Sequence, residues 1–107
     1  MRLGRMTRHN RHARVPLYVR AAEGFLTLDA ELHYDPTAVT VLGVHPVRGA
    51  RHALLATNTK LPGRLLVALA AATRLEDGAV LVLEFDPHDH QIDGNTVQVT
   101  RAAVGKD

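Results

Sequence analysis

Apolar and polar residues alternate strictly along residues 26–34. The apolar residues hold the even positions and the polar residues the odd ones: Leu26, Leu28, Ala30, Leu32 and Tyr34 against Thr27, Asp29, Glu31 and His33. A period of two predicts a β-strand with one buried face and one solvated face. Pro36 has no backbone N–H and favours an extended Asp35, so we expect a turn over Tyr34–Thr37. β-Branched residues then predict a second strand over Val39–Val44.

Two later runs are apolar at both odd and even positions. They are Leu65–Ala72, which reads LLVALAAA, and Ala79–Phe85, which reads AVLVLEF. Leu and Ala favour a helix in the first run, with Pro62 before it and Gly78 after it. We predict a strand instead, because the flanking segments are strand-like and tertiary context often overrides small propensity differences. Because the two runs hold more apolar residues than one core face can bury, we expect them to share an exposed apolar plateau.

The rest of the chain predicts shorter elements. Pro16 within Arg14–Arg20 favours an edge strand or the start of a strand. Residues 45–60 show no clear period, so we expect a long loop there, with at most a short strand over residues 53–56. A final strand is expected over Thr96–Thr100, with its valines pointing inward.

The order of these segments resembles cohesin modules, which share a class of β-sandwich with some carbohydrate-binding modules. The resemblance covers about residues 14–100 and rests on an ordered set of motifs: Val15–Val19, the alternating strand, Tyr34-Asp35-Pro36, the β-branched strand with Gly43-Val44, Gly63–Ala70 and Asp77–Phe85. It implies an all-β fold, a cohesin-like jelly-roll β-sandwich.

Composition and charge divide the chain into two parts. With 107 residues and no Cys, the chain is long enough to bury a core without disulfides. Residues 1–20 carry six Arg and no acid, for a net charge of +6, whereas the remainder has a net charge of −4. Residues 1–13 have too few apolar side chains to offset the entropy of ordering. We therefore predict a disordered Arg-rich tail over residues 1–13 and a cohesin-like β-sandwich domain over residues 14–107.

Two interpretations of the tail remain open. Its charge suits an arm for nucleic acid or another acidic surface, but it has no aromatic residue on which a base would stack, so we expect no specific nucleic acid partner. The other interpretation is a linker or an incorrectly assigned gene start. No apolar run is long enough for a membrane span, and the Arg-rich start lacks the apolar stretch of a signal peptide.

The sequence contains no recognisable catalytic motif. Ser is absent, and there is neither a phosphate-binding loop nor a His-Glu-x-x-His zinc motif. His88 and His90 are spaced as metal ligands can be, but a polar loop is the simpler interpretation. The series Asp89-x-Gln91-x-Asp93-Gly94 resembles the first half of a calcium loop, yet Thr100 stands where that loop requires a bidentate Glu. We expect no enzyme activity, no metal site and no cofactor.

The resemblance implies a protein-binding function. Cohesins bind dockerins, which are helical partner modules, through an apolar plateau on one sheet that also carries polar residues. Aligned on Tyr34-Asp35-Pro36, Asp29 falls where cohesins commonly have a dockerin-contacting polar residue. The expected partner-binding residues are Asp29, Val67, Leu69, Ala71 and Val82. A homodimer through the same apolar face is the alternative partner.

The same class leaves a carbohydrate-binding module open as a second function. Sugar-binding members present exposed aromatic rings. Here Tyr34 and Phe85 share the parity of the core and should be buried, so Tyr18 and Phe25 are the aromatic residues available to a sugar. With no Trp in the chain, this function has the weaker support. Either function implies an extracellular or cell-surface assembly that degrades polysaccharides.

Overall fold

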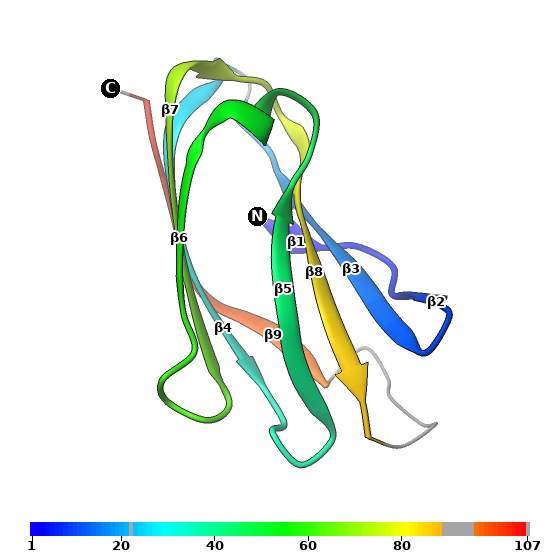
Figure 1. The fold of residues 1–107 in the computed structure, drawn as a ribbon. Helices are drawn as coiled ribbons and strands as arrows, with labels where there is room; N and C mark the ends of the chain where they lie inside the picture. The colour runs from blue at the N-terminus through cyan, green and yellow to red at the C-terminus, as the bar shows by residue number, and fades with distance from the viewer. Residues whose placement is uncertain (22, 89–95, 107) are drawn as a thin grey trace.

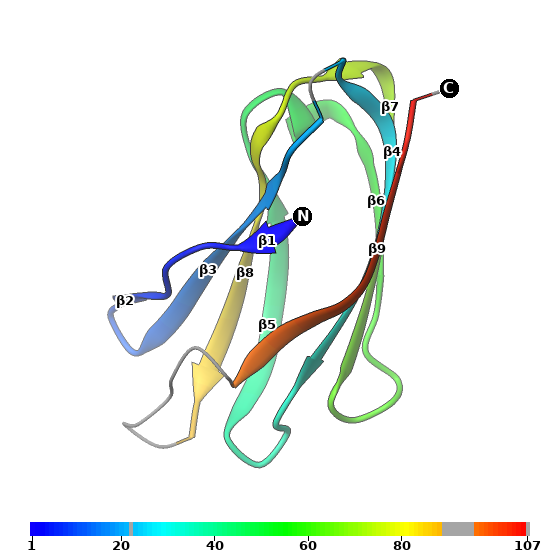
Figure 2. The same ribbon diagram turned by 180° about the vertical axis from the view of Figure 1, so that it is seen from behind.

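The chain folds into two antiparallel β-sheets packed face to face (Figures 1 and 2). The computed structural model describes residues 1–21, 23–88 and 96–106. Sheet A has the order β1–β3–β8–β5, with β2 also paired to β3; its strands are β1 (Arg2–Leu3), β2 (Thr7–His9), β3 (His12–Val19), β5 (Val39–Pro46) and β8 (Gly78–Pro87). Sheet B has the order β6–β7–β4–β9; its strands are β4 (Phe25–Tyr34), β6 (Leu54–Asn58), β7 (Arg64–Leu75) and β9 (Val97–Gly105). The predicted all-β sandwich is confirmed.

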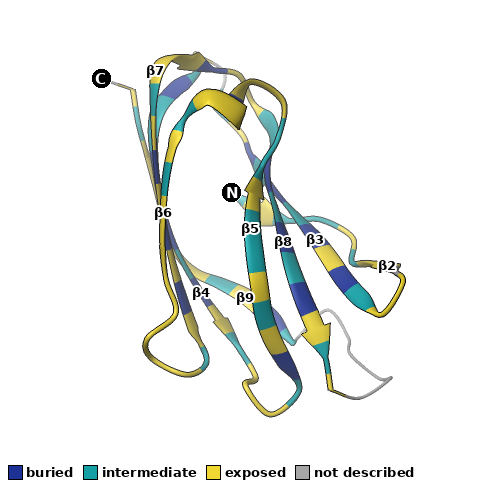
Figure 3. Ribbon diagram, in the orientation of Figure 1, coloured by how far each residue is buried: buried dark blue, intermediate teal, exposed yellow. Residues whose placement is uncertain are grey.

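The core lies between the sheets, and Figure 3 shows buried residues alternating with less buried ones along the long strands. The rings of Tyr34 from sheet B and Phe85 from sheet A meet there, with their centroids 6.2 Å apart. Among the described residues, no polar or charged side chain is buried, so apolar packing alone holds the sheets together. The largest fully buried side chains are Phe25, Phe85, Leu17, Leu28, Leu32, Leu65, Leu81, Leu83 and Val39.

The alternating segment forms β4, the strand at the centre of sheet B with β7 and β9 on its two sides. Its inward residues are buried as the alternation predicts: Leu28, Ala30 and Leu32. A register shift between Phe25 and Thr27 reverses this pattern at the start of the strand, so Phe25 is fully buried and Leu26 is only half-buried. The expectation that Phe25 is available to a sugar is therefore wrong, because a bulge exchanges the two faces of a strand.

The carboxylate of Asp35 holds the turn that follows β4. Its Oδ1 accepts hydrogen bonds from the backbone N–H of Thr37 at 2.9 Å and from the hydroxyl of Thr37 at 2.6 Å. The carbonyl of Asp35 accepts further bonds from the N–H groups of Ala38 and Val39. The Thr37 hydroxyl is the main reason that the pKa of Asp35 lies below its usual value. The predicted turn is confirmed, and it leads into β5.

Both runs that are apolar at odd and even positions are strands, as predicted. Residues 65–72 lie in β7, and residues 79–85 lie in β8. The two strands belong to different sheets, however, because β7 pairs with β4 and β6, whereas β8 pairs with β3 and β5. The expectation of one apolar plateau shared by these strands is wrong. The chain changes sheets at the turn before Gly78, whose φ of 126° suits glycine.

Residues 1–13 lie along the outer edge of β3 and do not form the predicted disordered tail. β1 pairs with the end of β3 and β2 with its beginning, and Asn10, with a φ of 57°, makes the tight turn between β2 and β3. Counting charges failed here because Met1, Leu3 and Met6 pack against the core and offset part of the cost of ordering. The predicted domain boundary falls inside β3.

The remaining segments contain more regular structure than the sequence predicts. Residues 45–60 include the end of β5, a 3₁₀ helix η1 (Arg48–His52) and β6. Pro16 lies between the stretches of β3 that pair with β1 and β2, and its carbonyl accepts a 2.8 Å bond from the N–H of Gly4. The last strand, β9, continues to Gly105, with Val97 buried as expected.

Candidate functional site: the outer face of sheet B

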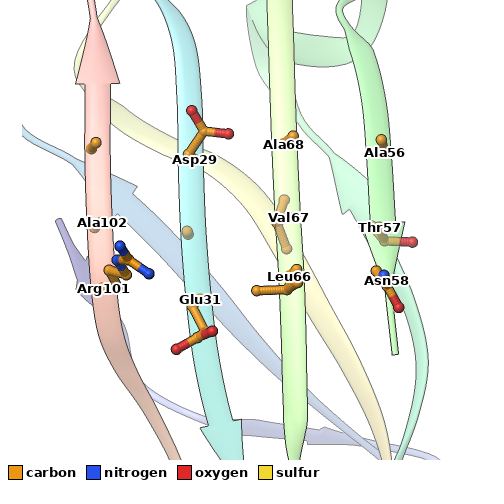
Figure 4. A pocket seen from close by; sticks show the side chains of 12 residues that line it. Asp29, Glu31, Ala56, Thr57, Asn58, Leu66, Val67, Ala68, Arg101 and Ala102 are labelled. Atoms are coloured by element: carbon orange, nitrogen blue, oxygen red, sulfur yellow. The ribbon is translucent and has the colours of Figure 1, made fainter. Parts of the chain in front are cut away.

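A shallow hollow crosses all four strands on the outer side of sheet B (Figure 4). It has a volume of about 740 Å³. We use the name sheet B face for its outward-pointing residues, which are Ala56 and Asn58 on β6, Leu66 and Ala68 on β7, Asp29 and Glu31 on β4, and Arg101 and Ala103 on β9. On the two inner strands, β4 and β7, these residues alternate with buried ones.

Cross-strand neighbours arrange the sheet B face in rows. One row consists of Ala56, Ala68, Asp29 and Ala103, and the next of Asn58, Leu66, Glu31 and Arg101. We call the first row the alanine row. It rises little above the backbone of the sheet, because three of its four side chains are single methyl groups. Leu66 stands beside it with 39% of its surface exposed. The result is a smooth, mostly apolar surface with one carboxylate in the middle of its first row.

That carboxylate belongs to Asp29, which is exposed and makes no hydrogen bond or ion pair with any residue that the structure describes. Its neighbours on β7 and β9 are Ala68 and Ala103, which offer neither a donor nor a charge. An ionised carboxylate accepts several hydrogen bonds, so Asp29 is free to receive them from a molecule that covers this face.

Glu31 lies two residues further along β4 and, unlike Asp29, has a partner on each carboxylate oxygen. Arg64 Nη2 binds its Oε1, and His33 Nε2 lies 3.2 Å from its Oε2. The hydrogen bond from Arg64 is the largest cause of a pKa below the usual value for this glutamate, with His33 contributing in the same direction. Opposite Glu31 on β9, the guanidinium of Arg101 is exposed. The face therefore offers one free anion, Asp29, and one cation at its margin.

Only one of the five predicted partner-binding residues lies on the sheet B face. Asp29 lies on the exposed face as expected. Val67 and Leu69 are each only 3% exposed and point into the core, as Ala71 does from a half-buried position. Val82 lies on β8, in the other sheet. These four assignments are wrong as members of one exposed face.

On β7 the prediction chose the odd-numbered residues, whereas the even-numbered ones point outward. A run that is apolar at both odd and even positions does not reveal which set faces the solvent. Within residues 65–72, the exposed residues are Leu66, Ala68, Ala70 and Ala72. A signal was present in the sequence: Arg64 and Arg74 at the two ends of β7 share their even parity, and a strand places such residues on one face.

Sheet A carries a second polar cluster on its outer side, centred on Glu84 of β8. Its Oε1 lies 3.1 Å from His45 Nε2, and its Oε2 lies 3.1 Å from His12 Nδ1 and 3.5 Å from Arg14 Nε. The bond with His45 is the main cause, and that with His12 the second, of a pKa below the usual value of about 4.5. No group of acids and histidines in the described part of the chain has the arrangement of a metal site.

We predict that Glu84→Gln reduces the loss of stability in acid. A carboxylate whose pKa is lowered by folding contributes stability that is complete above its usual pKa and is lost as the pH falls through the lowered value. The unmodified protein should therefore lose thermal stability between about pH 5 and about pH 3, and the variant should lose less in that window. Melting temperatures across this range measure the effect.

The matched control for this prediction is Asp86→Asn, which removes an exposed carboxylate two positions along the same strand. It should keep the acid dependence of the unmodified protein. If the melting temperatures of the Glu84 variant and the unmodified protein change equally with pH, the stabilising role of the Glu84 carboxylate is contradicted.

Those candidate sugar and metal residues that the structure describes are not assembled into sites. Phe25 is buried, and the ring of Tyr18 is covered by Arg2, whose guanidinium carbon lies 4.6 Å from the ring centroid. His88 is tied to the turn after β4, with its Nδ1 3.0 Å from the carbonyl oxygen of Thr37. His90 and the calcium-like series over residues 89–94 lie outside the described residues. In the described ranges, no helix has the length and apolar character needed to cross a membrane.

No protein-family model matches the sequence, and no curated protein is significantly similar to it. Solved structures share its fold, however. A cohesin module of a family 33 glycoside hydrolase from Clostridium perfringens matches with a TM-score of 0.72 and 12% identity, over 98% of this chain and 84% of that one. The sixth cohesin of scaffoldin B from Acetivibrio cellulolyticus, solved in complex with a Cel5 dockerin, matches with a TM-score of 0.71 and 18% identity, over 94% of this chain and 79% of that one.

A third structure, the seventh type I cohesin of ScaB from Pseudobacteroides cellulosolvens, has a TM-score of 0.70 and 16% identity, over 94% of this chain and 73% of that one. At these identities the likeness concerns the fold. The chain therefore has a cohesin-like fold, as the order of its sequence motifs predicts.

Proposed function

We propose that this cohesin-fold domain is a non-catalytic binding module that docks a dockerin-like helical partner on the sheet B face. The observation that carries the proposal is the unpaired carboxylate of Asp29 within an exposed surface of alanine and leucine. An exposed apolar patch with polar groups on it is typical of a protein interface. One of the structures with the same fold, the sixth cohesin of scaffoldin B, is a complex with a dockerin, which supports this class of partner.

The dimensions of the face suit a helix. Neighbouring strands lie about 4.8 Å apart, so β6 and β9 are separated by about 14 Å across the sheet. A helix with its side chains is about 10–12 Å wide and would cover the inner strands, β7 and β4, with β6 and β9 at its sides. Its apolar residues would pack on the alanine row and Leu66, and a Ser, Thr or Lys would donate to Asp29.

The proposed cellular context follows from the same likeness. The similar modules are described as parts of scaffoldins and of a glycoside hydrolase. We accordingly propose an extracellular or cell-surface assembly concerned with polysaccharides. The occupant in that assembly is a helical protein module, and not a sugar, because no aromatic residue is exposed on the sheet B face.

Isothermal titration calorimetry with a panel of dockerins, including the Cel5 dockerin, tests the function. We expect at least one to bind, and Asp29→Asn to weaken binding by about 10- to 100-fold, because hydrogen bonds to a charged group contribute about 1.5–3 kcal/mol. Asp86→Asn on sheet A is the matched control and should bind normally.

Failure of every dockerin, or full affinity in the Asp29 variant, would contradict the proposal. A homodimer through the same face is the competing occupant. Sedimentation velocity decides between them, because a dimer that Leu66→Lys converts to a monomer would assign the sheet B face to self-association.

A further inference from the structure

Arginine residues line the outer edge of sheet A. Arg2, Arg5, Arg8 and Arg11 recur at every third residue along β1, β2 and the turn into β3, and all four are exposed. Arg20 follows β3 and lines the same surface hollow as Arg2, together with Asp77, which forms no ion pair with either arginine. β1 and β2 both pair with β3, on the side of sheet A away from β8 and β5, and Figure 1 shows β2 beside the beginning of β3. The residues that the sequence placed in a disordered tail therefore present their charge from a fixed edge.

This charge is largely uncompensated. Among the described residues, none of Arg2, Arg5, Arg8, Arg11 and Arg20 has an ion pair with an acid. Residues 1–20 contain no acid at all, whereas the rest of the chain has a net charge of −4. Within the described ranges, the acid that forms ion pairs with residues 1–20 is Glu84, which Arg14 shares with two histidines. An anion with several charges would meet a row of free guanidinium groups.

The edge offers charge and little apolar surface. Met1, Leu3 and Met6, the large apolar residues of the segment, are half-buried and pack against the core. A protein partner would need an apolar centre to its interface, and a single-stranded nucleic acid or a sugar would need a free aromatic ring. The ring of Tyr18 is already covered by Arg2. The partner that fits is held by phosphate contacts alone.

We propose that the β1–β2 edge binds the phosphate backbone of a nucleic acid duplex without reading its sequence. A guanidinium pairs with a phosphate through two parallel N–H donors, and every basic residue of this segment apart from histidine is an arginine. Residues 2–11 span at most about 30 Å, which matches about nine base pairs of duplex. Because Asp29 lies on the other sheet, this binding is independent of the sheet B face.

Fluorescence anisotropy with two 20-base-pair DNA duplexes of unrelated sequence tests the proposal. The full chain should bind both with the same affinity, with a Kd of about 1–100 µM at about 50 mM salt. The slope of log K against log salt should be about −4 to −5, because five free guanidinium groups each release about 0.9 of a counterion. The variant Arg5→Gln/Arg8→Gln/Arg11→Gln should bind at least about tenfold more weakly, with a slope smaller by about 3.

The matched control is Arg51→Gln/Lys60→Gln/Arg74→Gln, which removes the same charge from exposed positions away from this edge. It should keep most of the affinity, and circular dichroism should show that both triple variants are folded. Four results would overturn the proposal: no binding at low salt, equal losses in the two triple variants, a preference of more than about tenfold for one duplex, or tighter binding of polyglutamate or polygalacturonate than of DNA at the same salt.

Discussion

Leu66→Lys should weaken the binding of a dockerin-like partner by about 30-fold or more. Leu66 is the largest apolar side chain on the sheet B face, and 39% of its surface is exposed in the unbound domain. Covering the exposed part of this leucine contributes about 1 kcal/mol, and burying an ammonium group in its place adds a larger desolvation cost. Each 1.4 kcal/mol corresponds to about a factor of ten in Kd. Calorimetry with whichever dockerin binds the unmodified domain measures the change.

The chain supplies a matched control in Leu42, which is 45% exposed and lies on β5 of the other sheet. Leu42→Lys makes the same chemical change and should leave the affinity unchanged. Both variants should retain thermal stability within about 1 kcal/mol, because surface substitutions seldom cost more. A loss of affinity in the Leu42 variant equal to that in the Leu66 variant would place the partner elsewhere on the domain.

Phe85→Ala should lower the free energy of unfolding by about 3–5 kcal/mol. Phe85 is fully buried on β8, and its ring packs against Tyr34 of the opposite sheet with the centroids 6.2 Å apart. Its removal leaves a cavity between the sheets, in a domain with no disulfide to limit the unfolded state. Since small domains have about 5–15 kcal/mol of total stability, the variant should be partly unfolded near physiological temperature.

Urea denaturation followed by circular dichroism measures this loss. Val104→Ala is the control, since Val104 is 38% exposed on the edge strand β9 and its truncation should cost less than about 1 kcal/mol. A loss below about 1 kcal/mol for Phe85→Ala would mean that the two sheets do not pack through this ring.

The two proposed binding surfaces have different physical origins. The sheet B face follows from small outward side chains on four neighbouring strands, which leave Asp29 without a partner in the described structure. The β1–β2 edge follows from a short segment whose apolar residues anchor it to the core while its charged side chains stay in solvent. The sheet B face would select a partner by its shape and by the carboxylate of Asp29, and the β1–β2 edge would select one by its negative charge.

Local patterns in the sequence determined most elements of the fold. Strict alternation predicts β4 with its buried and exposed faces, and Pro36 after Asp35 predicts the turn that follows. Both are local effects, since the side-chain period of a strand and the φ restriction of proline act within a few residues. The order of these local signals was also sufficient to indicate a cohesin-like sandwich and to place Asp29 on an exposed strand face.

Only the tertiary structure decided which strands are neighbours and which faces they share. β7 and β8 have the same apolar pattern, but they pair in different sheets, and β7 exposes Leu66 where the sequence suggested Leu69. A strand that is apolar on both faces pairs equally well in two registers one residue apart, and such a slip exchanges its faces. The order of residues 1–13 has the same kind of cause, because Leu3 and Met6 gain their stabilisation from core residues that are distant in sequence, and a local pattern carries no information about those contacts.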